Sequence, residues 1–432
     1  MKRYDSYKDS GVKWIGEIPN HWKLMTNKYF TKSQKNKSEF GDEVLLSVSE
    51  YQGVIPRRNI REGEEHLSRS ESLVGYLKVR KGELVSNIML MWKRGLGVSE
   101  YEGIVSPSYS VFSFKKSEPK YFHYLYRTDQ YVSEFRRNST GVIESRLRLY
   151  DDSFGSLKSH FPPLSEQQQI VSFLDTKTSL IDSLIEKTQR KIELLKEKRT
   201  SLINEVVTKG LNPNVEMKDS GVEWIGEIPS HWFCVGTNKV YHDLGTGTTP
   251  TSDNSEYYSD NGYHWITTTD LNEGIMYDTL SKITEKSVED YPNLRLYPSG
   301  SIYISMYGGR IGKLGVSTFD SYCNQSVCVL PKNDTIIVKF YYYWFLGFQE
   351  FVKGMGRGGG QPNINKDMIK SFPTVKIPLS EQQQIVDYLD EQTQLIDNTI
   401  SIEEKRIELL KEYRQSLISE VVTGKLKVTT DE

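Results

Sequence analysis

Two long segments of the chain place apolar residues at the spacing of an amphipathic helix. From residue 164 and again from residue 379, apolar side chains recur mostly at every third or fourth position, close to the seam of a coiled coil. Each segment has about 40 residues, so each helix would extend roughly 60 Å. The expected seam comprises Ile170, Leu174, Ile181, Leu184, Ile192, Leu195, Leu202 and Val206 in the first helix, and Ile385, Leu389, Ile396, Ile400, Ile407, Leu410, Leu417 and Val421 in the second.

The ends of both segments carry start and stop signals. Pro162 and Pro163 disfavour helix before the first segment, and Ser165 with Gln168 matches a capping box. Gly210 is a suitable end for the helix. The second segment repeats the arrangement with Ser380, Gln383 and Gly424.

Helices of this length need a partner for their apolar stripe. Because the two stripes match, we expect the helices to pair within the chain, antiparallel about a pseudo-twofold axis. Pairing between the helices of two copies of the chain is the alternative.

The regions before the two helices, residues 25–163 and 233–378, show a shorter apolar period. Valine, isoleucine and tyrosine alternate after Gly82 and after Gly300, and glycines mark turns, which predicts strands in both regions. Aromatic-rich stretches near Tyr121 and Lys339 predict helices packed on the sheet. Both inserts therefore look like α+β domains of one fold. Their loops differ, which suits two binding surfaces with separate specificities.

Short arms precede the inserts and are almost identical. Residues 8–22 read KDSGVKWIGEIPNHW and residues 218–232 read KDSGVEWIGEIPSHW, and LSEQQQIV opens both long helices. The arms are rich in Trp, Pro and Gly, so we expect irregular, docked segments with a structural role. The chain is thus a constant frame, repeated once, around two different inserts.

Composition sets limits on the class of protein. The chain has 432 residues, of which 37% are hydrophobic and 12% aromatic, enough to fill the cores of several domains. No run approaches the roughly 18 apolar residues that a bilayer crossing needs, and the first residues lack an apolar signal region. We therefore expect a cytoplasmic protein without a membrane partner. Cys234, Cys323 and Cys328 have no CxxC spacing or nearby histidine and are read as ordinary thiols.

Charge differs between the two inserts. The net charge of the whole chain is −2. Residues 25–160 hold 22 Lys and Arg against 17 Asp and Glu, whereas residues 235–375 hold 12 against 14. Binding to DNA would then depend on local patches or on a partner that neutralises phosphates, so we expect weak DNA binding by this chain alone.

Several loops have the side chains that contact nucleic acid. Residues 245–258 are rich in hydroxyl groups, and residues 356–365 combine flexible glycine with Arg, Gln and Asn, which suit guanine and adenine edges. Any single residue is equally compatible with an ordinary surface turn, so the prediction of a nucleic-acid interface depends on the whole set. The candidates are Arg57, Arg58, Arg136, Arg137, Arg146 and Arg148 in the first insert, and Thr248, Thr249, Ser252, Arg310, Arg357, Gln361, Asn363 and Asn365 in the second.

Motifs of restriction or modification chemistry are missing from the sequence. There is no NPPY-like methyltransferase tetrapeptide, no PD dipeptide to begin a nuclease site and no HExxH. The nearest string to a phosphate-binding loop, GGRIGKL from Gly308, has the wrong spacing. We therefore predict no catalytic and no metal-binding residues, and expect binding to be the function.

The arms SGVxWIGEIPxHW, the helix starts PLSEQQQIV and the GGGQPNIN loop resemble the specificity subunits of type I restriction-modification systems, over nearly the whole chain. The resemblance implies an arm and first target recognition domain in residues 1–163, a conserved long helix in 164–210, a linker, arm and second target recognition domain in 211–378, and a second long helix and tail in 379–432. The implied fold is α+β: two like domains joined by an intramolecular antiparallel coiled coil with pseudo-twofold symmetry.

The resemblance also implies partners and cofactors. Such subunits bind double-stranded DNA and two adenine-N6 methyltransferase subunits, and two motor-nuclease subunits complete the restriction complex. S-adenosylmethionine, ATP and Mg belong to the partner subunits, and the specificity subunit has no cofactor or catalysis of its own. Two other hypotheses stay open: a recognition subunit of another methyltransferase or nuclease arrangement, and a coiled-coil scaffold that binds only proteins.

Overall fold

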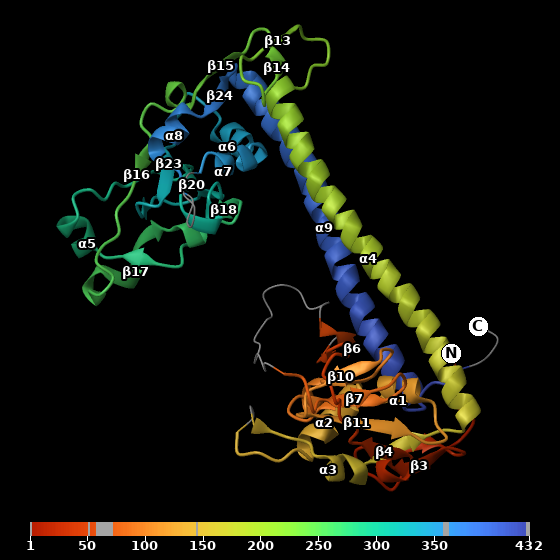
Figure 1. Ribbon diagram of the computed structural model, residues 1–432. Coiled ribbons are helices and arrows are strands. Elements are labelled where there is room, and N and C mark those ends of the chain that lie inside the picture. The colour runs from red at the N-terminus through yellow and green to blue at the C-terminus, as the bar shows by residue number, and fades with distance from the viewer. Residues whose placement is uncertain (1, 51, 58–71, 144–145, 357–362, 429–432) are drawn as a thin grey trace. The chain divides into compact units, whose positions relative to one another are not determined.

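The computed structural model describes residues 2–50, 52–57, 72–143, 146–356 and 363–428. It divides into two compact units (Figure 1). Unit 1 comprises residues 1–188 and 405–432, and unit 2 comprises residues 189–404. Each unit therefore holds one arm, one insert and one half of each long helix, and each is described by itself.

The insert of unit 1 is built on an antiparallel sheet in the order β4-β11-β8-β9. The central strands alternate between two cores, as the two-residue period of a strand requires. Leu84 and Phe112 point to one core, and Val85 and Val111 to the other. The strands of unit 1 are β1 Tyr7–Asp9, β2 Glu17–Pro19, β3 Lys23–Thr26, β4 Thr31–Gln34, β5 Leu46–Ser49, β6 Gly53–Pro56, β7 Leu77–Val79, β8 Leu84–Asn87, β9 Leu96–Val98, β10 Gly103–Val105, β11 Tyr109–Phe114 and β12 Lys158–Phe161.

The insert of unit 2 repeats this plan. Its main sheet has the order β16-β23-β20-β21-β18, and its first four strands take the places of β4, β11, β8 and β9. Ile302 and Ile304 point to one core and Tyr303 to another. The strands of unit 2 are β13 Met217–Asp219, β14 Glu227–Pro229, β15 Phe233–Gly236, β16 Gly245–Thr246, β17 Tyr258–Ile266, β18 Gly274–Met276, β19 Lys282–Ile283, β20 Ile302–Ser305, β21 Leu314–Ser317, β22 Tyr322–Cys323, β23 Val327–Leu330 and β24 Pro373–Lys376.

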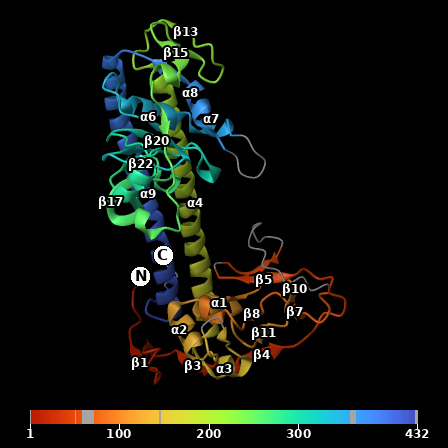
Figure 2. The ribbon, with the colours of Figure 1, turned by 90° about the vertical axis from the view of Figure 1, so that its left-hand side faces the viewer.

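Short helices cover one face of each main sheet, and Figure 2 shows α6 and α7 with β20 in unit 2. The aromatic-rich stretches form α1 and α6 as expected, and both are buried around most of their circumference. This is typical of a helix enclosed in a core. The short helices are α1 Pro119–Tyr126, α2 Asp129–Arg137, α3 Asp151–Ser156, α5 Glu285–Asp290, α6 Val338–Gly347, α7 Gln349–Gly354 and α8 Lys366–Ser371.

Each insert is attached to a long helix by the same pair of contacts. In unit 1, Asp175 accepts a hydrogen bond from Tyr124 Oη at 2.6 Å and an ion pair from Lys120 Nζ at 2.9 Å. In unit 2, Asp390 receives Tyr343 Oη and Lys339 Nζ, both at 2.6 Å. The constant frame therefore holds two different inserts with one set of side chains.

The two long helices are α4 Leu164–Lys209 and α9 Leu379–Val422. In unit 2, Lys191 pairs with Glu403 at 2.5 Å, and Arg199 pairs with Asp397 at 3.0 Å. The later residue of α4 therefore pairs with the earlier residue of α9. The halves in this unit are antiparallel. In unit 1, Arg414 of α9 pairs with Asp182 of α4 at 2.9 Å. Every residue of the expected seam is buried or half-buried.

The expected serine caps are wrong. The backbone N–H groups of Glu166 and Gln167 donate to the carbonyl of Pro163, so Ser165 lies inside the first turn rather than before it. In α9, Glu381 and Gln382 donate to Pro378 in the same way, which places Ser380 inside the helix as well. The connection to the insert is made instead by a buried glutamine in the first turn of each helix, Gln167 in α4 and Gln382 in α9.

Gln167 and Gln382 each join three parts of their unit. The side-chain oxygen of Gln167 accepts from the backbone N–H of Glu118 at 2.9 Å, and its nitrogen donates to the carbonyl of Pro162 at 2.8 Å. Gln382 accepts from Ile337 N at 2.8 Å and donates to Ile377 O at 2.9 Å. These bonds fix the start of each long helix to the start of α1 or α6.

Candidate nucleic-acid interface

The loop after β16 in unit 2 lies close to the turn between β22 and β23. Gly247 is required there, because a Cβ atom would stand 1.6 Å from the carbonyl oxygen of Cys323. Thr248 N donates to that carbonyl at 3.0 Å, and Trp265 Nε1 donates to Thr248 O at 3.1 Å. Thr249 Oγ1 donates to the side-chain oxygen of the exposed Gln325 at 2.5 Å. The hydroxyl-rich loop is thus fixed in place with polar side chains at the surface.

The same turn connects to the end of β20. Met306 N donates to Ser326 O at 2.8 Å, and Ile364 N donates to Met306 O at 3.0 Å. Tyr307 and Asn363 form a bridge in this ladder, and both side chains are exposed. The described part of unit 2 therefore brings Thr249, Gln325, Tyr307 and Asn363 to one connected surface.

The other candidates of unit 2 have varied surroundings. Arg310 is engaged by its own domain, since its guanidinium donates to the carbonyls of Thr268 at 2.7 Å and Leu271 at 2.8 Å. Asn365 caps α8 by accepting from Met368 N at 2.9 Å, although its side chain is exposed. Ser252 lies on the exposed part of the loop. Arg357 and Gln361 lie outside the described residues.

Unit 1 has an arginine-bearing hairpin at the equivalent place. Leu149 N donates to Ile88 O at 2.9 Å, as Ile364 does to Met306 in unit 2, and Arg148 pairs with Thr140 through two backbone hydrogen bonds. Arg146 and Arg148 are both exposed. Arg148 therefore takes the place that Asn363 has in unit 2.

The remaining arginines of the first insert are more dispersed. Arg136, at the end of α2, lies over the ring of Trp92 at 5.5 Å, in the segment that follows β8. Arg137 pairs with Glu134 at 2.5 Å. Arg57 follows β6 on another hairpin, and Arg58 lies outside the described residues. The structure thus gathers Arg136 and Arg148 near the end of β8 and leaves Arg57 elsewhere.

Strand pairing reveals candidates that the sequence analysis missed. Gln34 of β4 pairs with Val111, and Gly245 of β16 pairs with Val329, at matching places in the two main sheets. Counting onward from these pairs, Lys35 and Lys37 stand where Thr246 and Thr248 stand in unit 2. Both lysines are exposed.

The equivalence of Lys35 and Lys37 with Thr246 and Thr248 follows once β4 is aligned with β16, two strands that lie before Gly82 and Gly300 in the sequence. Tyr307 and Gln325 had no such signal, because their neighbours come from distant strands. These positions form equivalent surfaces on the two inserts. The side chains on this surface are basic in unit 1, whereas in unit 2 they carry hydroxyl, amide and phenol groups.

Buried titratable groups in both inserts belong to the cores rather than to a reactive site. Burial, with help from the nearby Arg127, lowers the pKa of His123 to about 3, and its Nδ1 accepts from Val98 N at 3.2 Å. Burial also raises the pKa of the Cys328 thiol to about 12, so this thiol is protonated at neutral pH. The three cysteines are free. Within the described residues, no cluster of His, Cys, Asp or Glu is arranged to hold a metal ion.

Two copies of one fold, attached alike to a repeated frame and carrying unlike loops, define a modular binding protein. The chain belongs to the family of type I restriction modification DNA specificity proteins, whose family model matches residues 86–194 and 242–412. It is 25% identical to the type I restriction enzyme MjaVIII specificity subunit of Methanocaldococcus jannaschii, over 98% of this chain and 97% of that one. It is 24% identical to the EcoR124I/EcoR124II specificity subunit of Escherichia coli, over 59% of this chain and 60% of that one.

Solved structures share the fold. A chain from a study of the assembly and conformational transition of a type I restriction-modification system matches with a TM-score of 0.71 at 16% identity, covering 95% of this chain and 99% of that one. The HsdS subunit from Thermoanaerobacter tengcongensis matches with a TM-score of 0.55 at 16% identity, covering 95% and 98%.

The chain is therefore a DNA-specificity subunit of a type I restriction-modification system. Its role in such a system is the recognition of DNA sequence, as a specificity subunit. Among the described residues, no helix combines the length and apolar character that crossing a membrane requires.

Proposed function

We propose that the chain reads a bipartite, asymmetric DNA site, one half with each insert. The observation that carries this proposal is the pair of matching sheets with unlike side chains at equivalent places, Arg148 in unit 1 against Asn363 in unit 2. Arginine suits guanine edges and asparagine suits adenine edges, whereas the lysines of unit 1 suit phosphates. Unlike surfaces on one fold would select unlike half-sites.

The long helices would connect and space the two readers as one intramolecular antiparallel coiled coil with pseudo-twofold symmetry. The antiparallel ion pairs within unit 2 and the buried seam support this arrangement. Half-sites read from one face of the duplex lie about one helical turn apart, roughly 34–36 Å. Each insert would then face the opposite strand and present one adenine on each.

Exposed leucines on the helices support two equivalent sites for protein partners. Unit 1 exposes Leu180 of α4 and Leu409 of α9, at 58% and 53% of their surface. At the same places in the repeat, unit 2 exposes Leu395 and Leu194, at 56% and 49%. Apolar side chains at helix-face positions favour docking of partner helices.

We infer that the partners are two adenine-N6 DNA methyltransferase subunits, joined by two motor-nuclease subunits in the restriction complex. S-adenosylmethionine would be held by the methyltransferases, and ATP and Mg by the motor subunits. Partner subunits would also supply cations around the DNA, since the insert of unit 2 has no excess of them. Access to chromosomal DNA would place the complex in the cytoplasm.

The test is to co-express the chain with its methyltransferase in a host without DNA methylation and to map N6-methyladenine across the genome. The expected result is a two-part motif with a fixed unspecified spacer and one methylated adenine on each strand. If a stable complex with the methyltransferase produced no new methylation, the DNA-reading proposal would fail and a protein-binding scaffold would be favoured.

A further inference from the structure

The arm meets the end of one long helix and the start of the other once in each unit. Junction 1 comprises residues 2–22, the first turn of α4 and residues 423–428, and junction 2 comprises residues 209–232 and the first turn of α9. In both, a histidine of the arm pairs with a glutamate of the helix start: His21 with Glu166 and His231 with Glu381, each at 2.8 Å. The two junctions are built from one design.

A tryptophan forms the floor of each junction. Trp22 and Trp232 are fully buried. The glycine that ends the neighbouring long helix lies against each ring, Gly424 at Trp22 and Gly210 at Trp232, and both glycines have positive φ. The helix end and the arm are therefore fixed alike in the two units.

The junctions differ at the place that Tyr4 fills, and junction 1 also contains the tail, whose Lys427 N donates to Lys2 O at 2.9 Å. In junction 1, the ring of Tyr4 packs edge-on against Trp22 with centroids 5.8 Å apart, and its hydroxyl donates to Glu166 Oε1 at 2.5 Å. Tyr4 is 8% exposed, so it fills its place. The two oxygens of Glu166 are thus shared between Tyr4, at Oε1, and His21, at Oε2. The Nε1 of Trp22 has no hydrogen-bond partner among the described residues.

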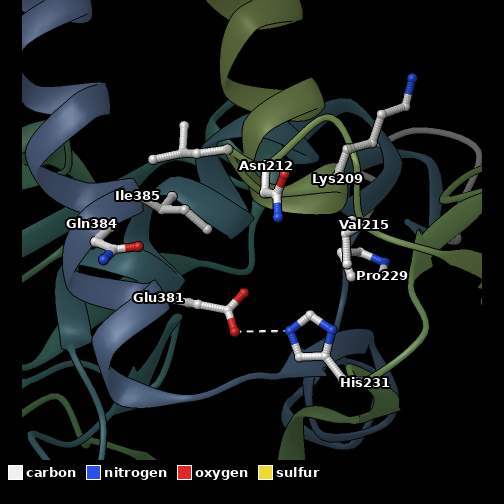
Figure 3. A pocket seen from close by; sticks show the side chains of 10 residues that line it. Lys209, Asn212, Val215, Pro229, His231, Glu381, Gln384 and Ile385 are labelled. Carbon is white, nitrogen blue, oxygen red and sulfur yellow. Dashed lines mark hydrogen bonds and ion pairs between the residues drawn. The ribbon is translucent and has the colours of Figure 1, made fainter.

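Junction 2 has no such ring. The linker runs from α4 into β13, and Asn214 stands at the place in the repeat where Tyr4 stands, with its side chain exposed. A cavity of about 440 Å³, lined by Leu211, Asn212 and Val215 of this linker, lies next to that position (Figure 3). Trp232 Nε1 donates to Glu381 Oε2 at 2.9 Å, which occupies the oxygen that receives tyrosine in junction 1.

The cavity has the two kinds of wall that a phenol needs. Ile385, Val215 and Pro229 provide apolar surface, and Glu381 presents its carboxylate to the interior beside His231 (Figure 3). A carboxylate has about four acceptor positions on its two oxygens, so Glu381 can accept a hydroxyl in addition to His231 and Trp232. The remaining wall consists of Lys209, Gly210, Leu211, Asn212 and Gln384.

We propose that this cavity in unit 2 receives a tyrosine side chain from the methyltransferase subunit that docks on this unit. The proposal rests on the proposed function, which supplies the partner. Tyr4 is the template, because Glu166 and His21, the equivalents of Glu381 and His231, contact its side chain in junction 1. A second copy of the chain is disfavoured as the donor, because its own Tyr4 is already buried in its junction 1.

One consequence is that the two methyltransferase copies bind unequally. The copy on unit 2 gains a buried aromatic contact of the kind that dominates interface energies. The copy on unit 1 meets a junction that the chain has filled itself. The first methyltransferase bound is then the one on unit 2.

Filling the cavity from within the chain tests the proposal in the intact complex. Asn214→Tyr supplies the ring from the chain itself, and Leu211→Trp covers the cavity from an exposed wall position. Lys425→Trp is the matched control, because Lys425 follows Gly424 in junction 1 as Leu211 follows Gly210 in junction 2. Each variant is titrated with methyltransferase by calorimetry after its melting temperature has been compared with that of the unchanged chain.

We expect both cavity variants to weaken one of the two binding events at least tenfold, while the control leaves both events as they were. Unchanged binding in a folded cavity variant overturns the tyrosine site and leaves the proposed function intact. Failure of the unchanged chain to bind any methyltransferase overturns the proposed function itself.

A photoreactive phenylalanine analogue at position 211 identifies the occupant. The expected product links the chain to a tyrosine-containing peptide of the methyltransferase, and replacement of that tyrosine by alanine reproduces the loss seen with Asn214→Tyr. A product with a second copy of this chain, or with a methyltransferase peptide without tyrosine, overturns the assignment.

Discussion

Lys35 and Lys37 show how one place in the fold can be given two chemistries. They continue β4, while the equivalent residues of unit 2 are Thr246 and Thr248. Both lysine side chains are exposed. A lysine on a DNA-facing strand end contributes mainly a phosphate contact, which positions the protein without reading a base.

Replacement of both lysines by glutamine is therefore expected to weaken DNA binding evenly across sequences. Each lost phosphate contact reduces the slope of log affinity against log salt by about 0.9, so the double variant should lose about 2. Fluorescence anisotropy of the methyltransferase complex at several salt concentrations measures this slope. Glutamines at Lys115 and Lys116, at the other end of β11, are the control and should leave the slope unchanged.

Two buried histidines make the stability of unit 1 depend on pH. Burial lowers the pKa of His160 to about 3, as it does for His123, while an unfolded histidine titrates near 6.5. Below about pH 6.5 these histidines bind protons in the unfolded chain but stay neutral in the folded chain. The free energy of unfolding therefore falls as the pH falls toward 3. Above pH 6.5 the full contribution is present.

The expected slope is at most about 1.4 kcal/mol per pH unit for each histidine. Urea unfolding at pH 8, 7, 6 and 5 gives the free energy of unfolding, and His123→Gln and His160→Gln should each flatten its decline. The exposed His242, replaced in the same way, serves as the reference. A decline that survives the double substitution would assign the acid sensitivity to other groups.

At the scale of elements, the start of each long helix is defined by a buried glutamine rather than by a serine cap. Each of these glutamines, Gln167 and Gln382, bonds two backbone groups at once. Its oxygen accepts from the N–H before α1 or α6, and its nitrogen donates to a carbonyl just after β12 or β24. Removal of either side chain leaves a buried carbonyl and a part-buried N–H without partners, and an unpaired buried group typically costs about 1–3 kcal/mol.

Gln382→Ala should therefore lower the free energy of unfolding of unit 2 by at least about 2 kcal/mol. Gln168→Ala, at an exposed position near the start of α4, should change stability by less than about 0.5 kcal/mol. Denaturant unfolding followed by tryptophan fluorescence compares the two. Equal effects would show that the glutamine bonds do not fix the helix.

The elements also show what a sequence can and cannot predict. The helices and their seam follow from a local period, and the repeated frame follows from shared wording, so both were predicted. The link from Gln167 to Glu118 joins residues far apart in the chain, and no local rule indicates it. The same limit hid Tyr307 and Gln325, whose neighbourhood is created by strand pairing, and the internal hydrogen bonds of Arg310.

At the scale of the whole molecule, the repeated attachment of the inserts argues that they are interchangeable. Asp175 and Asp390 hold a tyrosine and a lysine of their own insert with closely similar geometry. The buried glutamines make equivalent bonds as well. An insert that keeps this tyrosine, this lysine and the helix-start contacts should fold on either half of the frame.

The sharpest test replaces residues 25–163 with a second copy of residues 235–378. Because both sites of attachment then hold the same reader, the methylated motif should become palindromic, with the half-site of the second insert on both sides of the spacer. Mapping of N6-methyladenine in the host that carries this chimaera and the methyltransferase measures both halves at once. The matched control exchanges the insert of unit 2 for residues 25–163 and should give the other palindrome. If either chimaera altered the half-site read by the untouched insert, recognition would depend on the pair of inserts together, and the modular account would be wrong.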